Sequence, residues 1–370
     1  MGVLKVQQTV RIPAFDAARS VMMLLGLAVH TFLVIDFFQP NLSVDEKSFF
    51  ASAYQFIHVF RMPVFFIIGG FFSAYLILQR GSRAFVVSRF KRVVSPLLAA
   101  EFAVASVVYL NGCTWCANPS GPGLTGLLSN GWLYLWFLFY LALISHAALL
   151  AHLVTKRLKI GSAGGASRWS LKVSLNPAEI AVFALLATLL PNVLDEKSRL
   201  RVVTNLIPDL SVLAFFALLF WTGWLAYKNS EMAIEAIRKW WLANLLAGVL
   251  ATLIWPVGAI WFISFGVLGG FLRFANRSTK TMQYLSDASY WIYLVHPPLV
   301  IGLLAVLGQL GWPVAVTVLV EMALTLIITL GSYHFVVRYT VIGKWLSGRR
   351  RPTRKERMAQ ELSANPALQL

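Results

Sequence analysis

Long apolar runs separated by short polar segments dominate the chain. Runs such as 178–190, 210–227 and 312–333 approach the roughly 20 residues with which a helix crosses about 30 Å of hydrocarbon. Because backbone groups in lipid must bond to one another, such runs predict helices. The pattern predicts an all-α polytopic membrane helical bundle of about ten spans: 17–38, 52–78, 95–111, 131–154, 177–194, 205–227, 240–255, 257–272, 284–307 and 312–337.

One apolar stretch, 240–272, is interrupted by the sequence WPVG at 255–258, which leaves two halves that are short for membrane spans. A single helix there would place Arg273 and the basic residues after it on the outer side. Two spans joined at 255–258 keep these residues on the inner side with the other basic segments, as the positive-inside rule requires.

Composition supports the membrane assignment, since 58% of the 370 residues are hydrophobic and only 13% are charged. The net charge of +17 follows mostly from topology. With both termini cytoplasmic, most of the 32 Lys and Arg residues lie inside, whereas the outer loops hold only Lys47, Lys197, Arg199 and Arg201. No cleavable signal peptide is expected, because the first span is long enough to stay in the membrane.

Two regions are expected: a transmembrane domain at 1–345 and a basic cytoplasmic tail at 346–370. The sequence GRRRPTRKER at 348–357 could in principle contact nucleic acid, but a solvated tail against anionic lipid headgroups explains it as well, and no nucleic-acid partner is expected. The sequence does not reveal an oligomeric state.

The only two cysteines, Cys113 and Cys116, fall in a predicted outer loop rich in Gly and Pro. A local disulfide and two idle thiols are both compatible with this position, and a redox role is a third reading. Two cysteines cannot complete a structural zinc site, and no metal is expected.

Several titratable residues lie within predicted spans. Such a group costs several kcal/mol at membrane depth unless it faces the bundle interior, so each is a candidate for function. They are His30, His58, Arg61, Glu101, His296 and Glu321.

The first span combines a basic residue at its start with a histidine further in. Arg19 and His30 are eleven residues apart, so they return to nearly the same helix face about 16 Å apart along the axis. One extended molecule with an anionic head and a reactive tip could touch both, and an acyl-coenzyme A fits that description. Singly, Arg19 could be an interface anchor paired with Asp16, and His30 a core imidazole bonded to a neighbouring helix.

Arg61 and His296 are expected at a depth similar to that of His30. Arg61 precedes Pro63 and a Gly69-Gly70 pair, a combination that predicts a bent helix beside a polar cavity. The alternative is an ion pair between Arg61 and one of the two buried glutamates that merely holds helices in register.

The predicted inner loop at 80–96 holds five basic residues, with Arg89 and Arg92 on one helix face. Positive-inside bias explains the number of basic residues. Binding of a coenzyme's phosphates is the functional interpretation.

These stretches resemble the acyltransferase-3 family of membrane acyltransferases, whose mark is an Arg and a His separated by ten residues in the first helix. The resemblance extends to FRMPVFFIIGGFFS from residue 60, the Arg89/Arg92 pair, WFLFY at 136–140 and SYWIYLVHPPL at 289–299. The stretches look most like the glucans biosynthesis protein C group, which adds succinyl groups to periplasmic glucans. Many relatives carry a histidine where this chain has Tyr134, so the role of that histidine does not carry over.

The resemblance implies that His30 is essential and that Arg19, Arg89 and Arg92 serve the acyl donor; Asp16, one turn before Arg19, completes the predicted donor-binding set. We expect a bacterial inner-membrane O-acyltransferase that moves an acyl group, such as succinyl, from cytoplasmic acyl-CoA (succinyl-CoA or acetyl-CoA) to a hydroxyl of a periplasmic glycan, with no permanently bound cofactor.

In this expectation His30 is the general base or is itself acylated. Arg61, with His296, stabilises the oxyanion or holds a succinyl carboxylate. The rival hypothesis is a glycan or organic-anion transporter that uses Arg61 and the histidines as a binding site without chemistry. A purely structural membrane subunit is the third hypothesis, and the buried polar residues argue against it.

Overall fold

The computed structural model describes residues 12–110, 133–158, 172–196, 199–201, 204–277 and 279–347. Cys113, Cys116 and the tail beyond 347 lie outside these ranges. The described residues are mostly helical, and their only β-type pairing is an isolated bridge between Leu194 and Leu200. The helices are α1 (Pro13–Phe38), α2 (Val44–Arg89), α3 (Ser95–Leu110), α5 (Trp136–Arg157), α6 (Pro177–Thr188), α7 (Leu210–Lys228), α8 (Ser230–Lys239), α9 (Trp241–Ile254), α10 (Pro256–Phe274), α11 (Lys280–Leu307), α12 (Val314–Ser332) and α13 (Val341–Ser347).

The all-α membrane bundle predicted from the apolar runs is confirmed, and each of the ten predicted spans contains a helix. Among the described residues, seven helical stretches are long and apolar enough to cross a membrane, or eight if α8 and α9, bent by 63° at their junction, form one span. This count leaves out α6, which has only 12 residues, and treats 44–102 as one stretch. Ten spans therefore stay a prediction.

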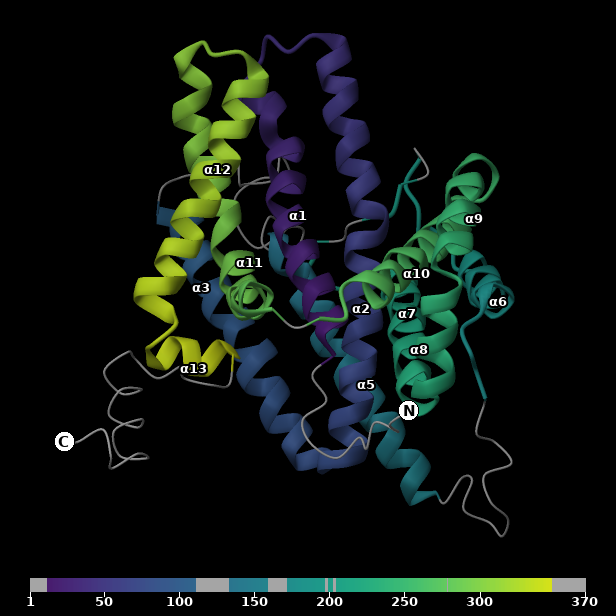
Figure 1. The fold of residues 1–370 in the computed structure, drawn as a ribbon. Coiled ribbons are helices and arrows are strands. Elements are labelled where there is room, and N and C mark those ends of the chain that lie inside the picture. Colours follow the sequence, from purple (N-terminus) through teal and green to yellow (C-terminus); the bar gives the residue numbers. More distant parts are fainter. Residues whose placement is uncertain are drawn as a thin grey trace, which may run out of the picture.

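The stretch 44–102 reverses direction. Gly81 has a φ of 81°, a backbone conformation that glycine adopts at no steric cost, and it interrupts α2. Figure 1 shows the chain descending along α2, turning at its lower end and rising again through α3. The two predicted spans at 52–78 and 95–111 thus lie on two helical segments that run in opposite directions.

The break predicted at 255–258 separates two antiparallel helices, α9 and α10. Gly248 lies against Ile263, and Gly266 lies against Leu245, so the residue numbers on facing positions run in opposite directions. Pro256 begins α10, where its missing N–H costs no helical hydrogen bond. The prediction of two helices in this stretch is confirmed.

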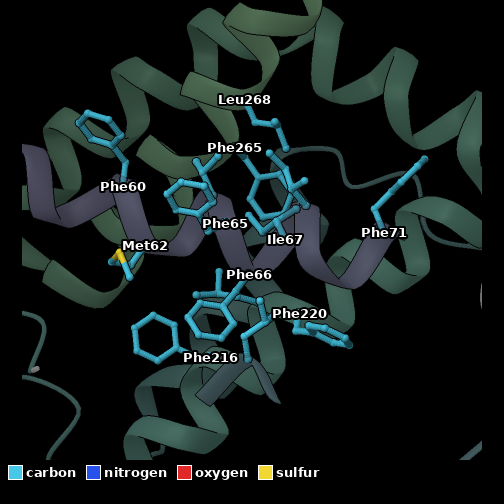
Figure 2. Close-up of a cluster of buried hydrophobic side chains, with 14 of the residues drawn as sticks. Phe60, Met62, Phe65, Phe66, Ile67, Phe71, Phe216, Phe220, Phe265 and Leu268 are labelled. Carbon is cyan, nitrogen blue, oxygen red and sulfur yellow. The ribbon is translucent and has the colours of Figure 1, made fainter. Parts of the chain in front are cut away.

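The helices are arranged around α1 and α2. On one side of α1 lie α11 and then α12, whereas α2 packs against α7 and α10 (Figure 1). The largest apolar cluster surrounds α2: Phe66 stacks on Phe216 of α7 with ring centroids 4.4 Å apart, and Phe265 and Leu268 of α10 approach from another side (Figure 2). This cluster makes α2 a rigid support for the polar residues that it carries.

Glycines allow α2 and α7 to cross in backbone contact. A Cβ added to Gly70 would lie 1.9 Å from the carbonyl oxygen of Phe220, and one added to Gly223 would lie 1.8 Å from that of Ile67. The close helix approach expected from the Gly69-Gly70 pair is confirmed for Gly70.

We expect Gly70→Ala to destabilise the protein by about 3 kcal/mol, because the methyl group can fit only if the two helices separate and lose packing. Thermal unfolding of the purified protein in lipid nanodiscs measures this effect. Gly302→Ala on α11 is the matched control, since nothing lies within 4 Å of a Cβ added there. Equal melting temperatures for the two variants would contradict the backbone crossing.

The beginning and the end of the described chain lie at the same end of the bundle. Arg19 near the start of α1 and Leu346 in α13 line one cavity, and Trp345 Nε1 donates a hydrogen bond of 2.8 Å to Ser95 Oγ. We call this the basic end, because four arginines gather there, and the opposite end the far end. That the basic end faces the cytoplasm stays a prediction.

Candidate active site

A cavity of about 430 Å³ opens at the basic end, between α1, α2, α5 and α11. Four arginines and two aspartates contribute to its lining, so positive charge is in excess. All four residues of the predicted donor-binding set, which the sequence places on α1 and near the end of α2, line this one cavity. The charged lining residues are Asp16, Arg19, Arg80, Arg89, Arg92 and Asp287.

Neighbouring side chains orient parts of this charged lining. Arg89 Nη2 donates to Ser73 Oγ at 2.5 Å, and the Arg89 guanidinium lies 5.4 Å from the ring centre of Phe85. Ser73 in turn donates to the Gly69 carbonyl at 2.6 Å. Nε of Arg89 is buried and has no hydrogen-bond partner among the described residues. Arg89 is therefore preorganised and retains an unused donor, as expected for a residue that binds an anion.

The remainder of the lining is largely apolar. It includes Met23 of α1, Phe65 and Phe72 of α2, and Leu138 and Leu141 of α5. A cavity that combines an arginine-rich mouth with apolar walls suits a ligand with an anionic head and a less polar arm.

A second polar cluster lies deeper along the same helices. The rings of His30 (α1) and His296 (α11) have centroids 5.0 Å apart, packed edge to face. A Cβ added to Gly26 of α1 would lie 2.9 Å from Arg61 Nη1 and 3.5 Å from His296 Nε2. Thus His30, Arg61 and His296 converge from three helices, as their predicted depths suggest.

The tautomer of His296 follows from its contacts. Nδ1 lies 2.8 Å from the carbonyl oxygen of Ile292, which can only accept a hydrogen bond, so Nδ1 carries a proton. In the neutral ring, Nε2 then presents a lone pair. It has no hydrogen-bond partner among the described residues, although the side chain is 1% exposed.

Other buried polar atoms around this cluster also lack partners among the described residues: Arg61 Nε and both ring nitrogens of His58. A buried polar group without a partner costs about 1–3 kcal/mol. Several such groups in one place make this cluster a candidate ligand-binding site.

The cavity and the histidine cluster are adjacent. On α1, Met23 lines the cavity and Gly26 borders Arg61 and His296, a separation of one helical turn or about 4.5 Å. On α11, Tyr290 lines the cavity and stacks on Tyr293 at 6.5 Å. The ring of Tyr293 lies 6.4 Å from that of His296. A ligand whose head is at the arginines can therefore bring its other end toward the histidines.

The structural alternative for Arg61 is wrong. Glu321 accepts hydrogen bonds of 2.6 Å from Thr31 Oγ1 and from Thr325 Oγ1, and so joins α1 to α12. Within the described ranges, Arg61 forms no ion pair with Glu321 or with Glu101. Glu321 has a structural role, and the guanidinium remains available to a ligand.

Tyr134, the position at which the family resemblance led us to expect a histidine, is held by backbone contacts. Its hydroxyl donates to the Leu294 carbonyl at 3.0 Å, and its own carbonyl accepts from Tyr293 Oη at 2.9 Å. The ring packs 6.4 Å from that of His30. Tyr134 therefore supports His30 and ties α11 to the segment before α5.

Sequence reasoning did not identify Gly26, Tyr293 or Arg80. Gly26 gave a weak signal, since a glycine on the helix that carries Arg19 and His30 permits close approach of a polar group. Arg80 is indistinguishable from its neighbours in the basic loop, and Tyr293 stands in an aromatic stretch typical of any membrane helix. Only the packing places them at the cavity and the histidine cluster.

Comparison with known proteins identifies the family. The sequence profile described as "Acyltransferase domain" matches residues 12–336. Among named relatives, "Glucans biosynthesis protein C" of Salmonella heidelberg (strain SL476) is 23% identical over 318 residues, 77% of this chain and 81% of that protein. The protein of the same name from Escherichia coli (strain SMS-3-5 / SECEC) is 37% identical over 86 residues, only 23% of this chain and 22% of that protein.

A further relative with this name, from Salmonella paratyphi B (strain ATCC BAA-1250 / SPB7), is 28% identical over 142 residues, 36% of this chain and 37% of that protein. No solved structure matches the chain. The family profile covers α1 to α12 and contains both the arginine-lined cavity and the histidine cluster. This chain belongs to the family of membrane acyltransferases that carry this acyltransferase domain.

Proposed function

We propose that this protein is a bacterial inner-membrane O-acyltransferase that takes an acyl group from acyl-CoA at the basic end and delivers it to a hydroxyl of a periplasmic glycan. The observation that carries the proposal is the position of the arginine-lined cavity one helical turn from the cluster of His30, Arg61 and His296. Membership of the acyltransferase family supplies the reaction class.

The cavity suits acyl-CoA as donor. Coenzyme A carries several phosphates, and Arg19, Arg80, Arg89 and Arg92 outnumber the two aspartates of the lining. Its long arm would follow the apolar wall toward His30, which lies about 16 Å from Arg19 along α1. The thioester would then lie at the histidine cluster while the phosphates remain at the basic end.

The proposed chemical step uses His30 as general base. Its neutral imidazole takes the proton of the acceptor hydroxyl as that oxygen attacks the thioester carbonyl. The C–S bond then breaks, protonated His30 returns its proton to the sulfur, and the coenzyme leaves as a thiol. Arg61, which lies beside Gly26 together with His296, stabilises the oxyanion that forms at the carbonyl. In a second route, His30 is itself acylated and passes the group on to the acceptor.

The identity of the acyl group and of the acceptor belongs to the proposal as well. The relatives are named for glucan biosynthesis, which supports a glucan acceptor. Arg61 supports succinyl as the acyl group, because a guanidinium without an ion-pair partner among the described residues can fork onto a terminal carboxylate.

Binding of coenzyme A separates this proposal from a transporter that performs no acyl transfer. We expect purified protein in lipid nanodiscs to bind coenzyme A with measurable heat in titration calorimetry. We also expect this binding heat to disappear at high salt, because salt screens the charged contacts between the arginines and the phosphates. A protein that binds glycan but no coenzyme A would support the transporter instead.

We expect Arg19→Ala and Arg89→Ala to raise the Kd for coenzyme A and the KM for the acyl donor by about 10- to 100-fold each, since a charge-assisted contact contributes roughly 1.5–3 kcal/mol. Arg338→Ala is the control, because Arg338 packs on Tyr284 and does not line the cavity. Calorimetry measures all three variants. If both cavity variants bound coenzyme A with unchanged affinity, these arginines would serve only the positive-inside topology and not donor binding.

A further inference from the structure

Helix α2 orders the polar residues along the bundle axis. It begins at the far end with Val44, and from Phe65 onward its residues line the basic cavity. Arg61 stands one turn before Phe65, and His58 one turn before Arg61. His58 therefore lies on the far-end side of Arg61, away from the cavity, and its neighbour Ile57 packs against Ala28 and Val29 of α1, at about the depth of His30.

His58 is a buried imidazole that the proposed donor site does not use. Its side chain is 5% exposed, and neither ring nitrogen has a hydrogen-bond partner among the described residues. Tyr54, one turn nearer the far end, stacks on it with ring centroids 5.3 Å apart and an interplanar angle of 10°. The stacking fixes the ring plane and leaves both nitrogens unsatisfied at its edge.

His58 and Tyr54 have polar neighbours both in the histidine cluster and toward the far end. His58 and Arg61 are both close enough to His30 to act on it electrostatically. Tyr54 is within electrostatic reach of Asp195 and Arg199, which form an ion pair in the segment after α6. Tyr54 thus extends the polar residues of α2 from His58 toward the far end, from which the acceptor of the proposed reaction would come.

We propose that His58, supported by Tyr54, binds the carbohydrate hydroxyl that receives the acyl group. This inference rests on the proposed function and assigns the acceptor side of its site. A neutral imidazole offers one donor and one acceptor, and a hydroxyl needs one of each. The unsatisfied nitrogens of His58 therefore match an alcohol better than they match a carboxylate or a cation.

His58 and His30 have different roles in the transfer step. The acceptor oxygen receives a hydrogen bond from the His58 N–H and gives its proton to His30, while the oxygen attacks the thioester carbonyl. The acyl–sulfur bond breaks, the coenzyme sulfur takes the proton that His30 holds and leaves as a thiol toward the basic end, and the new ester leaves toward the far end. The second nitrogen of His58 is available to a neighbouring hydroxyl of the same sugar.

The test measures steady-state acyl transfer from succinyl-CoA to a linear β-glucan oligosaccharide. It compares the wild-type protein with His58 variants, each as the full chain in nanodiscs. His58→Phe keeps the stacked ring but removes both hydrogen-bonding atoms. We expect kcat/KM for the oligosaccharide to fall at least about tenfold, with the KM for succinyl-CoA and the Kd for coenzyme A unchanged. His58→Gln, whose amide offers one donor and one acceptor, should recover part of the loss.

Asn244→Leu is the matched control. Asn244 is fully buried in α9, and both of its side-chain polar atoms also lack partners among the described residues, but it lies outside the cavity and the histidine cluster. Its transfer kinetics should equal those of wild type. Wild-type kinetics in His58→Phe, or an equal loss in His58→Gln and His58→Phe, would overturn the assignment of His58 alone. Failure of the wild type to transfer to the oligosaccharide would overturn the glucan acceptor together with this inference.

Discussion

Replacing His30 with alanine is expected to abolish acyl transfer while the protein still folds. The imidazole is half-buried between His296 and Tyr134, and removing it takes away the proposed base without leaving a buried charge unpaired. A general base contributes about 10²- to 10⁴-fold, so kcat should fall by at least about 100-fold. Transfer assays in membranes that contain matched amounts of protein measure the loss.

His152→Ala on α5 is the control for His30→Ala, since this histidine packs near Trp224 and lies outside the site. Its activity should match that of wild type. If His30→Ala kept more than a few per cent of wild-type transfer, His30 would not be the base, and His296, whose Nε2 lone pair is unused, would be the next candidate.

Replacing Arg61 with methionine is expected to change donor preference. A succinyl group carries a carboxylate that the guanidinium can bind in a bidentate manner, whereas an acetyl group offers no such partner. The variant should lose about 10- to 100-fold in kcat/KM for succinyl-CoA and much less for acetyl-CoA. Kinetics with the two coenzyme A esters in wild type and variant measure the difference.

Arg61→Lys is the matched variant for this comparison, because it keeps the charge but cannot bind a carboxylate in a bidentate manner. An intermediate loss with succinyl-CoA is expected. Parallel losses with both donors, in a variant that remains folded, would make Arg61 an oxyanion donor. A wild-type preference for acetyl-CoA would exclude the carboxylate-binding role.

Hydropathy predicted the helical segments because burial in lipid demands internal backbone bonding whatever the tertiary contacts are. The spacing of Arg19 and His30 predicted that the cavity and the histidine cluster follow one another along α1, because both residues lie on one helix whose geometry is fixed. The positions of Arg61 and His296 along their own spans were enough to predict that both lie at about the depth of His30. These predictions depend only on distances along individual helices.

Contacts that depend on the rotation of one helix against another could not be predicted in this way. The sequence does not show that Thr31 and Thr325 satisfy Glu321, so an Arg61–Glu321 ion pair remained open until the structure excluded it. It likewise does not show that Gly26 faces Arg61, because a glycine in a membrane helix can face any neighbour or lipid. Such facts require the packed bundle.

The most direct test of the central claim is transfer across the membrane. Inverted inner-membrane vesicles that contain the protein expose the cytoplasmic face outward, and they can be loaded with β-glucan oligosaccharide before radiolabelled succinyl-CoA is added outside. The account predicts label on the enclosed oligosaccharide, with none in vesicles that carry His30→Ala. Label that appears only when oligosaccharide and succinyl-CoA are on the same side, or no label at all, would contradict it.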